Sequence, residues 1–207
     1  MYNTIYYLLN SKHSKEKEAL MKYIQSVCVY CGSCMGNNPL YQKIAQDLGK
    51  FLGQNNINLI YGGGTKGLMG LLANATQQNG AKVTGIIPEF LMNKEANEKD
   101  IKKLDHYIIT ETMHERKYAM FAHADAVITL PGGIGTLEEL VEIITLAQLE
   151  QHNKPIILIN INQFWDPLIT LLSHMQKEGF IHSQDKIKLH IIDDIGNLSN
   201  ILTKAVL

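Results

Sequence analysis

Cysteine is scarce in this chain, and its scarcity argues against a metal centre. The 207 residues include only three cysteines, Cys28, Cys31 and Cys34, whose close spacing imitates part of an iron–sulfur or zinc cluster. A fourth cysteine is lacking, although a histidine could in principle replace it. The odd separation of Cys28 and Cys31 would place their side chains on opposite faces of a strand. We therefore expect no bound metal, and three free thiols favour a reducing compartment.

The chain also lacks a strong excess of charge and any long hydrophobic run. Its formal net charge is −1 at pH 7, so no strong attraction to nucleic acid or to a membrane surface is expected. No apolar run is long enough to span a bilayer. The apolar patch at residues 5–9 has neither the basic lead nor the long apolar core of a signal peptide. The sequence therefore predicts a cytoplasmic protein with no nucleic-acid or membrane partner.

What the sequence does contain is a regular alternation of apolar runs and stretches of helical spacing. The apolar runs occur near residues 27–30, 57–61, 82–87, 106–109, 126–130, 155–160 and 188–192. The stretches with helical spacing lie at about 39–53, 67–79, 111–124, 136–151, 166–178 and 195–206. This alternation predicts an α/β fold: a doubly wound, mainly parallel sheet of Rossmann-like type with helices on both faces. We expect one domain at residues 26–207, an N-terminal extension at residues 1–25, and a loop or short helix at about residues 90–103.

The most informative stretch is a glycine-rich junction at residues 131–139, with the sequence PGGIGTLEE. It follows an apolar run and precedes an amphipathic one, which predicts a strand, a tight turn and a helix in succession. Such a junction directs backbone N–H groups, at the positive end of a helix dipole, into one small space that suits a phosphate. Glu139, one helical turn further on, suggests that the phosphate belongs to a substrate. An alternative stays open, because Thr136 and Glu139 also match the capping box S/T-x-x-E.

A second glycine-rich loop follows the apolar run 57–61. Gly62, Gly64 and Gly67 match G-x-G-x-x-G, the dinucleotide-binding fingerprint, between a predicted strand and a predicted helix. Glu89 lies near the position of the acid that the fingerprint needs, although this loop follows the second predicted strand rather than the first. A Walker loop is excluded, because glycine follows Lys66 where serine or threonine is required. The loop predicts either a phosphate contact or tight packing of a helix on a strand.

A basic pair near the start of the stretch 111–124 is a further candidate. Arg116 and Lys117 lie where positive charge works against the helix dipole. Such a mismatch is expected where function needs a cation, and the fork of an arginine suits phosphate or carboxylate. An ordinary surface pair is the alternative. His114 and Glu115 do not form a zinc motif, because no histidine follows at the required spacing.

Together these motifs resemble the LOG ("Lonely guy") family of cytokinin riboside 5′-monophosphate phosphoribohydrolases, often mislabelled lysine decarboxylases. The likeness rests on M-x-x-R-K at residues 113–117 and P-G-G-x-G-T-x-x-E at residues 131–139, and it extends from about residue 27 to the C-terminus. The chain departs from the family pattern at Cys34, where a second serine is common, and at Asn93-Lys94, where Pro-Arg is usual. The resemblance implies a single LOG domain and a homodimer or higher homo-oligomer, with the active site near the subunit interface.

By the same resemblance, Arg116 and Glu139 form the catalytic pair. The positions that would contact substrate are Gly32, Ser33, Gly63, Gly64, Glu95, Lys117, Gly133, Ile134, Gly135, Thr136, Leu137, Glu138 and Thr145. The expected reaction is hydrolysis of the N-glycosidic bond in an adenine, or N6-modified adenine, nucleoside 5′-monophosphate, with no metal and no organic cofactor. Glu139 would stabilise an oxocarbenium-like transition state or accept a proton from water, and Arg116 would keep Glu139 ionised by pairing with it.

Two functions of other classes compete with this hypothesis. A molybdenum-cofactor carrier has the same architecture and would hold a phosphorylated pterin without hydrolysis, although the presence of Arg116 and Glu139 argues against that role. A nicotinamide-dependent oxidoreductase would use the loop from Gly62 to Gly67 and would bind NADH.

Overall fold

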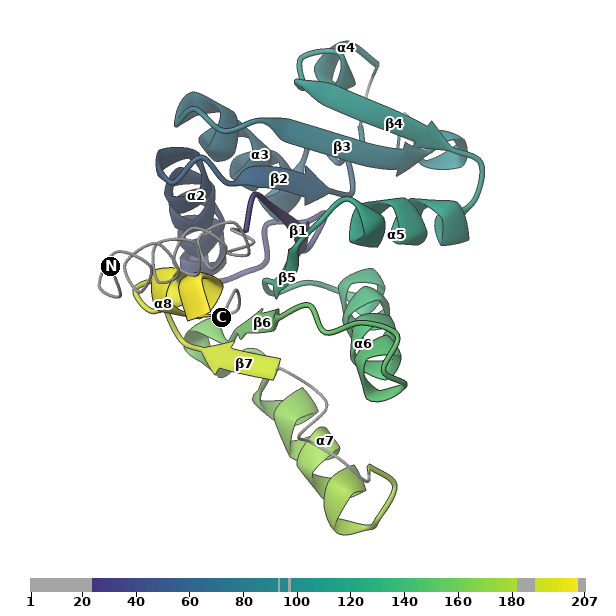
Figure 1. The fold of residues 1–207 in the computed structure, drawn as a ribbon. Coiled ribbons are helices and arrows are strands. Elements are labelled where there is room, and N and C mark those ends of the chain that lie inside the picture. Colours follow the sequence, from purple (N-terminus) through teal and green to yellow (C-terminus); the bar gives the residue numbers. More distant parts are fainter. Residues whose placement is uncertain (1–23, 93, 97, 182–188, 205–207) are drawn as a thin grey trace, which may run out of the picture.

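The structure is a computed structural model that describes residues 24–92, 94–96, 98–181 and 189–204 (Figure 1). The extension predicted at residues 1–25 lies outside these ranges, apart from its last two positions. No helix within the four described ranges is long and apolar enough to cross a membrane.

Seven parallel strands form one sheet, which confirms the predicted fold class. The strands are β1 (Ser26–Tyr30), β2 (Asn58–Tyr61), β3 (Val83–Pro88), β4 (His106–Thr110), β5 (Ala126–Thr129), β6 (Ile156–Ile159) and β7 (Leu189–Ile192). Their order is β4-β3-β2-β1-β5-β6-β7, and every neighbouring pair is parallel. The direction of winding reverses between β1 and β5. In such a sheet, ligands bind beyond the carboxyl ends of the strands at this reversal.

Helices connect the strands and cover both faces of the sheet (Figure 1). They are α2 (Pro39–Gln54), α3 (Gly67–Gln78), α4 (Glu98–Ile101), α5 (Met113–Ala122), α6 (Ile134–Gln148), α7 (Asp166–Lys177) and α8 (Leu198–Lys204), with short 3₁₀ turns η1 (Glu89–Leu91) and η2 (Ile161–Gln163). Side chains of α2, α3 and α8 pack into the core on one face, and those of α5, α6 and α7 pack into the core on the other. The predicted loop or short helix at residues 90–103 contains the helix α4.

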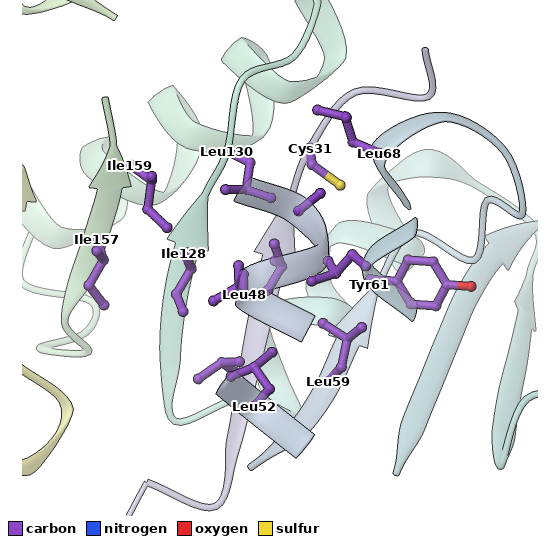
Figure 2. Close-up of a cluster of buried hydrophobic side chains, with 14 of the residues drawn as sticks. Cys31, Leu48, Leu52, Leu59, Tyr61, Leu68, Ile128, Leu130, Ile157 and Ile159 are labelled. Carbon is purple, nitrogen blue, oxygen red and sulfur yellow. The ribbon is translucent and has the colours of Figure 1, made fainter. Parts of the chain in front are cut away.

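Alternate residues of the strands contribute to the two cores. Figure 2 shows one core, in which Leu48 and Leu52 of α2 lie over the strands that carry Ile128 and Leu59. Cys31 belongs to this core, whereas Cys28 belongs to the core on the opposite face. The prediction that these two cysteines face opposite sides of the sheet is therefore confirmed.

Candidate active site

A cavity of about 240 Å³ lies beyond the carboxyl end of β1, beside the start of α6 and the first turns of α5. The residues that line it are Val29, Tyr30, Cys31, Gly32, Ser33, Gly62, Met69, Glu95, Met113, Arg116, Met120, Gly133, Ile134, Gly135, Thr136, Glu138 and Glu139. Most of the site residues predicted from the sequence are among them. The cavity also lies where the winding of the sheet reverses, the position at which a ligand is expected.

The start of α6 forms one wall of this cavity. The helix begins at Ile134, and Gly133 occupies the N-cap position without any side-chain cap. The first N–H groups of a helix have no partner within the helix, and here the residues from Ile134 to Thr136 line the cavity. A Cβ atom added at Gly133 or Gly135 would meet nothing within 4 Å. The helix start is thus open to an anion, with the dipole oriented to attract it.

The capping box considered for Thr136 and Glu139 is not formed, because α6 begins two residues earlier than the sequence predicted. A related arrangement occurs instead at α5. Thr112 accepts a hydrogen bond from the N–H of Glu115 at 3.1 Å, and the Glu115 carboxylate accepts one from the N–H of Glu111 at 3.0 Å. This cap fixes the start of α5 and places the next residue, Arg116, toward the cavity.

Arg116 is buried, with 6% of its surface exposed, and β3 and the residue after β2 anchor its guanidinium. Its Nε donates to the carbonyl oxygen of Ile86 at 3.2 Å, and its Nη2 donates to that of Gly62 at 3.1 Å. A Cβ atom at Gly62 would lie 1.9 Å from Nη2, so only glycine leaves room for this approach. The guanidinium is therefore a fixed cation at the ends of β2 and β3, which excludes the simple alternative of a surface charge.

Glu139 is also buried, with 8% of its surface exposed. Its Oε1 lies 4.0 Å from Nη1 of Arg116. Burial raises the pKa of Glu139 from 4.5 to about 7; Arg116 lowers it, while Glu138 and Glu95 raise it. The effect of desolvation on the pKa is therefore larger than that of the pairing with Arg116, and the expectation that Arg116 keeps Glu139 ionised is wrong. Near neutral pH both protonation states of the carboxyl are populated.

Glu95 is the third carboxyl of the cavity and comes from the connection between β3 and β4. Its Oε2 is buried and finds no hydrogen-bond partner among the residues that the structure describes. Its backbone oxygen accepts a hydrogen bond from the N–H of Thr65 at 3.0 Å, which ties this connection to the loop after β2. A buried carboxylate oxygen without a partner is a natural acceptor for a ligand hydroxyl or N–H group.

Five of the predicted substrate contacts are not among the residues that line the cavity: Gly63, Gly64, Lys117, Leu137 and Thr145. Both glycines are buried, and Leu137 packs against the core beneath α6. Thr145 is exposed, and its hydroxyl donates to the carbonyl oxygen of Val141 at 2.8 Å. Lys117 instead forms ion pairs with side chains of α6.

The loop that matches the dinucleotide fingerprint serves mainly in packing. The N–H of Leu68, in the first turn of α3, donates to the carbonyl oxygen of Gly32 at 3.1 Å. A Cβ atom at Gly67 would lie 2.2 Å from the backbone of Ser33. The loop after β1 therefore covers the start of α3, where a pyrophosphate would bind in a nicotinamide-dependent enzyme. This arrangement favours the packing alternative over the oxidoreductase.

Among the described residues, no group of three or more His, Cys, Asp or Glu side chains is arranged to hold a metal ion. The three cysteines are free, with Cys28 and Cys31 buried and Cys34 exposed. Burial raises the pKa of the Cys28 and Cys31 thiols.

Comparisons with known proteins identify the family. The family model described as "Possible lysine decarboxylase" matches residues 69–202. The probable cytokinin riboside 5′-monophosphate phosphoribohydrolase LOG4 of Oryza sativa subsp. japonica is 41% identical over 182 residues, which cover 88% of this chain and 78% of that protein. This chain belongs to the LOG family. A second LOG relative, the probable phosphoribohydrolase LOG6 of Arabidopsis thaliana, is 46% identical over 157 residues, or 76% of this chain and 77% of that protein.

The LOG chain also shares its fold with proteins of other names. The molybdenum cofactor binding protein of the phototrophic bacterium Rippkaea orientalis superposes with a TM-score of 0.64 over 90% of this chain and 99% of that one. The two sequences are only 20% identical, so this likeness concerns the architecture alone.

Several lining residues of the LOG cavity were not predicted from the sequence. Tyr30 and Cys31 stand at the carboxyl end of β1, and Met69 and Met120 come from α3 and α5. Tyr30 and Cys31 could have been predicted, because residues at the carboxyl end of a parallel strand are expected to lie near a ligand. No sequence signal distinguishes the two methionines from ordinary core residues.

Proposed function

We propose that this LOG protein hydrolyses the N-glycosidic bond of a nucleoside 5′-monophosphate whose base is adenine or an N6-modified adenine. The products are the free base and ribose 5-phosphate. The observation that carries the proposal is the placement of the Arg116 guanidinium and the Glu139 carboxyl, 4.0 Å apart, in a cavity that the first residues of α6 also line. The names of the LOG relatives support the same reaction.

The cavity offers groups that suit the phosphate and the sugar of such a substrate. The N–H groups from Ile134 to Thr136 bind the 5′-phosphate. When the bond between the sugar and the base breaks, its electron pair leaves with the base and positive charge develops on the sugar. A water molecule then adds to the anomeric carbon and loses one proton, and the departing base gains one, so that the products are ribose 5-phosphate and the neutral base.

Glu139 can serve both steps. In its ionised form it stabilises the positive sugar, and it then accepts the proton of the attacking water. A pKa of about 7 suits a group that accepts a proton during the cycle and releases it again near neutral pH. Arg116 binds the sugar phosphate and moderates the pKa of Glu139. The unpartnered oxygen of Glu95 accepts a ribose hydroxyl or assists the leaving base.

A base-release assay tests this proposal. The purified protein is incubated with AMP, isopentenyl-adenosine monophosphate, GMP, CMP and adenosine, and the free base is measured by chromatography. We expect release from the adenine nucleotides and none from adenosine, which lacks the phosphate. The matched variant Glu139→Gln should bind nucleotide normally but turn over about 100-fold more slowly. Nucleotide binding without any base release from the wild-type protein would favour a carrier.

A homodimer and a cytoplasmic location belong to the same proposal. Apolar side chains along α6 are exposed in the single chain, with 81% of Ile134, 42% of Val141 and 61% of Leu149 accessible. Association of two chains through this helix would cover them. Light scattering coupled to size-exclusion chromatography should give twice the chain mass, and Val141→Glu should reduce it to a monomer. The three free thiols support a reducing compartment.

A further inference from the structure

Two adjacent basic residues of α5 have different surroundings. Arg116 lines the cavity, whereas Lys117 does not. The ammonium nitrogen of Lys117 lies 2.5 Å from Oε1 of Glu138 and 3.1 Å from Oε2 of Glu142, and both carboxylates belong to α6. Only 14% of the Lys117 side chain is exposed. A single lysine, whose side chain is mostly covered, therefore joins α5 to two side chains of α6.

The two partners of Lys117 flank Glu139 along α6. Glu138 immediately precedes it, and Glu142 lies one helical turn beyond Glu138. Across the same pair of helices, Arg116 and Glu139 face each other in the cavity at 4.0 Å. The helix turn that carries Glu139 is thus joined to α5 twice, by Lys117 through Glu138 and Glu142 and by the approach of Arg116 to Glu139.

We propose that Lys117 is a positioning residue. Its ion pairs with Glu138 and Glu142, which we call the clasp, hold the first turns of α6 against α5 and so set the separation of Arg116 from Glu139. The inference rests on the proposed function, and it gives Lys117 a role beside the substrate contact that the resemblance suggests. The two carboxylates already take donors of this ammonium, and the side chain lies outside the cavity lining.

The clasp also affects the charge state of Glu139. The groups that act on this carboxyl are Arg116 and Lys117 from α5, Glu138 from the same helix and Glu95 from the β3–β4 connection. Cys28 and Tyr30 of β1, and Cys31 directly after it, stay neutral because burial raises the pKa of each. Lys117 lowers the pKa of Glu139 and Glu138 raises it. Loss of the ammonium removes the first effect and leaves the charge of Glu138 uncompensated, so the pKa of Glu139 should rise.

The test compares Lys117→Met, Lys117→Arg and Glu142→Gln with the wild-type enzyme. Kinetics of base release are measured from pH 5 to pH 9 with the best nucleotide of the release assay. We expect Lys117→Met to lower kcat about tenfold, because a small misplacement of reacting groups is costly, while KM stays within about twofold. The acidic limb of the pH–rate profile of this variant should move to higher pH. Lys117→Arg should restore most of kcat, and Glu142→Gln, which lies outside the cavity, should lower kcat less strongly.

Lys43→Met serves as the matched control, since Lys43 forms an exposed ion pair with Asp47 on α2 and should have no effect. A large rise in KM with unchanged kcat in Lys117→Met, or a Glu142→Gln variant identical to wild type, would overturn the positioning role. A second readout needs no substrate: the carboxyl resonance of Glu139 is titrated by ¹³C NMR, and its midpoint should rise in Lys117→Met. If the wild-type protein released no base, the proposed function would fail. The clasp would be rejected separately if the titration midpoint of Glu139 were the same in Lys117→Met as in the wild type.

Discussion

Replacing Glu139 by glutamine should stabilise the protein increasingly as the pH rises. Burial raises the pKa of this carboxyl from 4.5 to about 7. The folded protein therefore retains a proton that the unfolded chain has already released, and the free energy of unfolding falls as pH increases between these two values. Each pKa unit corresponds to about 1.4 kcal/mol, so ionising the buried group costs about 3 kcal/mol at pH 8 and under about 1 kcal/mol at pH 5.

Urea unfolding of the wild type and of Glu139→Gln, followed by circular dichroism at pH 5, 6, 7 and 8, measures this cost. Glutamine has no proton to lose, so the difference in unfolding free energy between the two proteins should grow by about 2 kcal/mol from pH 5 to pH 8. The effect of Arg116 on the ionised carboxyl is already contained in the pKa. Changes in packing add an offset that does not depend on pH, and the slope is therefore the informative quantity. Glu89→Gln, at an exposed position, is the control. A difference that stays constant or shrinks as the pH rises would refute the reasoning.

Three further changes probe the same site. Arg116→Ala should reduce kcat/KM at least about 100-fold, and Arg116→Lys should not rescue it, because an ammonium cannot reproduce the fork that binds the carbonyls of Gly62 and Ile86; near-normal kinetics would remove the arginine from the site. Gly62→Ala should retain the far-UV spectrum yet lose activity, since its Cβ would lie 1.9 Å from the guanidinium; a fully active variant would contradict this packing. A thiol reagent at pH 8 should modify Cys34 quickly and the two buried cysteines only on unfolding. Rapid modification of all three cysteines in the folded protein would contradict the burial of Cys28 and Cys31.

The sheet was predictable because its strands are continuous apolar runs. A parallel strand covered on both faces needs no polar alternation, and so it stands out clearly between amphipathic stretches. The structure moves the ends of these elements by only one to three residues in most cases. The largest functional consequence is at α6, which begins at Ile134 because Gly133, rather than Thr136, occupies the cap position. Two segments match the capping pattern, and sequence alone could not tell that only the one at Thr112 is used.

The site was predictable as a set of motifs but not as a geometry. Motifs identified Arg116 and Glu139, yet they could not indicate that the neighbouring Lys117 forms ion pairs with two side chains of α6. The raised pKa of Glu139 could not be predicted from the sequence either, because the desolvation comes from elements distant in the sequence. Side-chain direction and burial depend on tertiary packing, which local patterns do not encode.

The arrangement of β1 between β2 and β5 divides the candidate site between two segments of the chain. Arg116 and both of its carbonyl partners precede the end of α5, whereas Glu139 and the amide groups of α6 follow the start of β5. A cut in the short connection between Ala122 and Ala126 would give two fragments, and neither would contain a complete cavity. Base release would then begin only when the fragments reassociate, so the fold lends itself to use as a split-enzyme reporter.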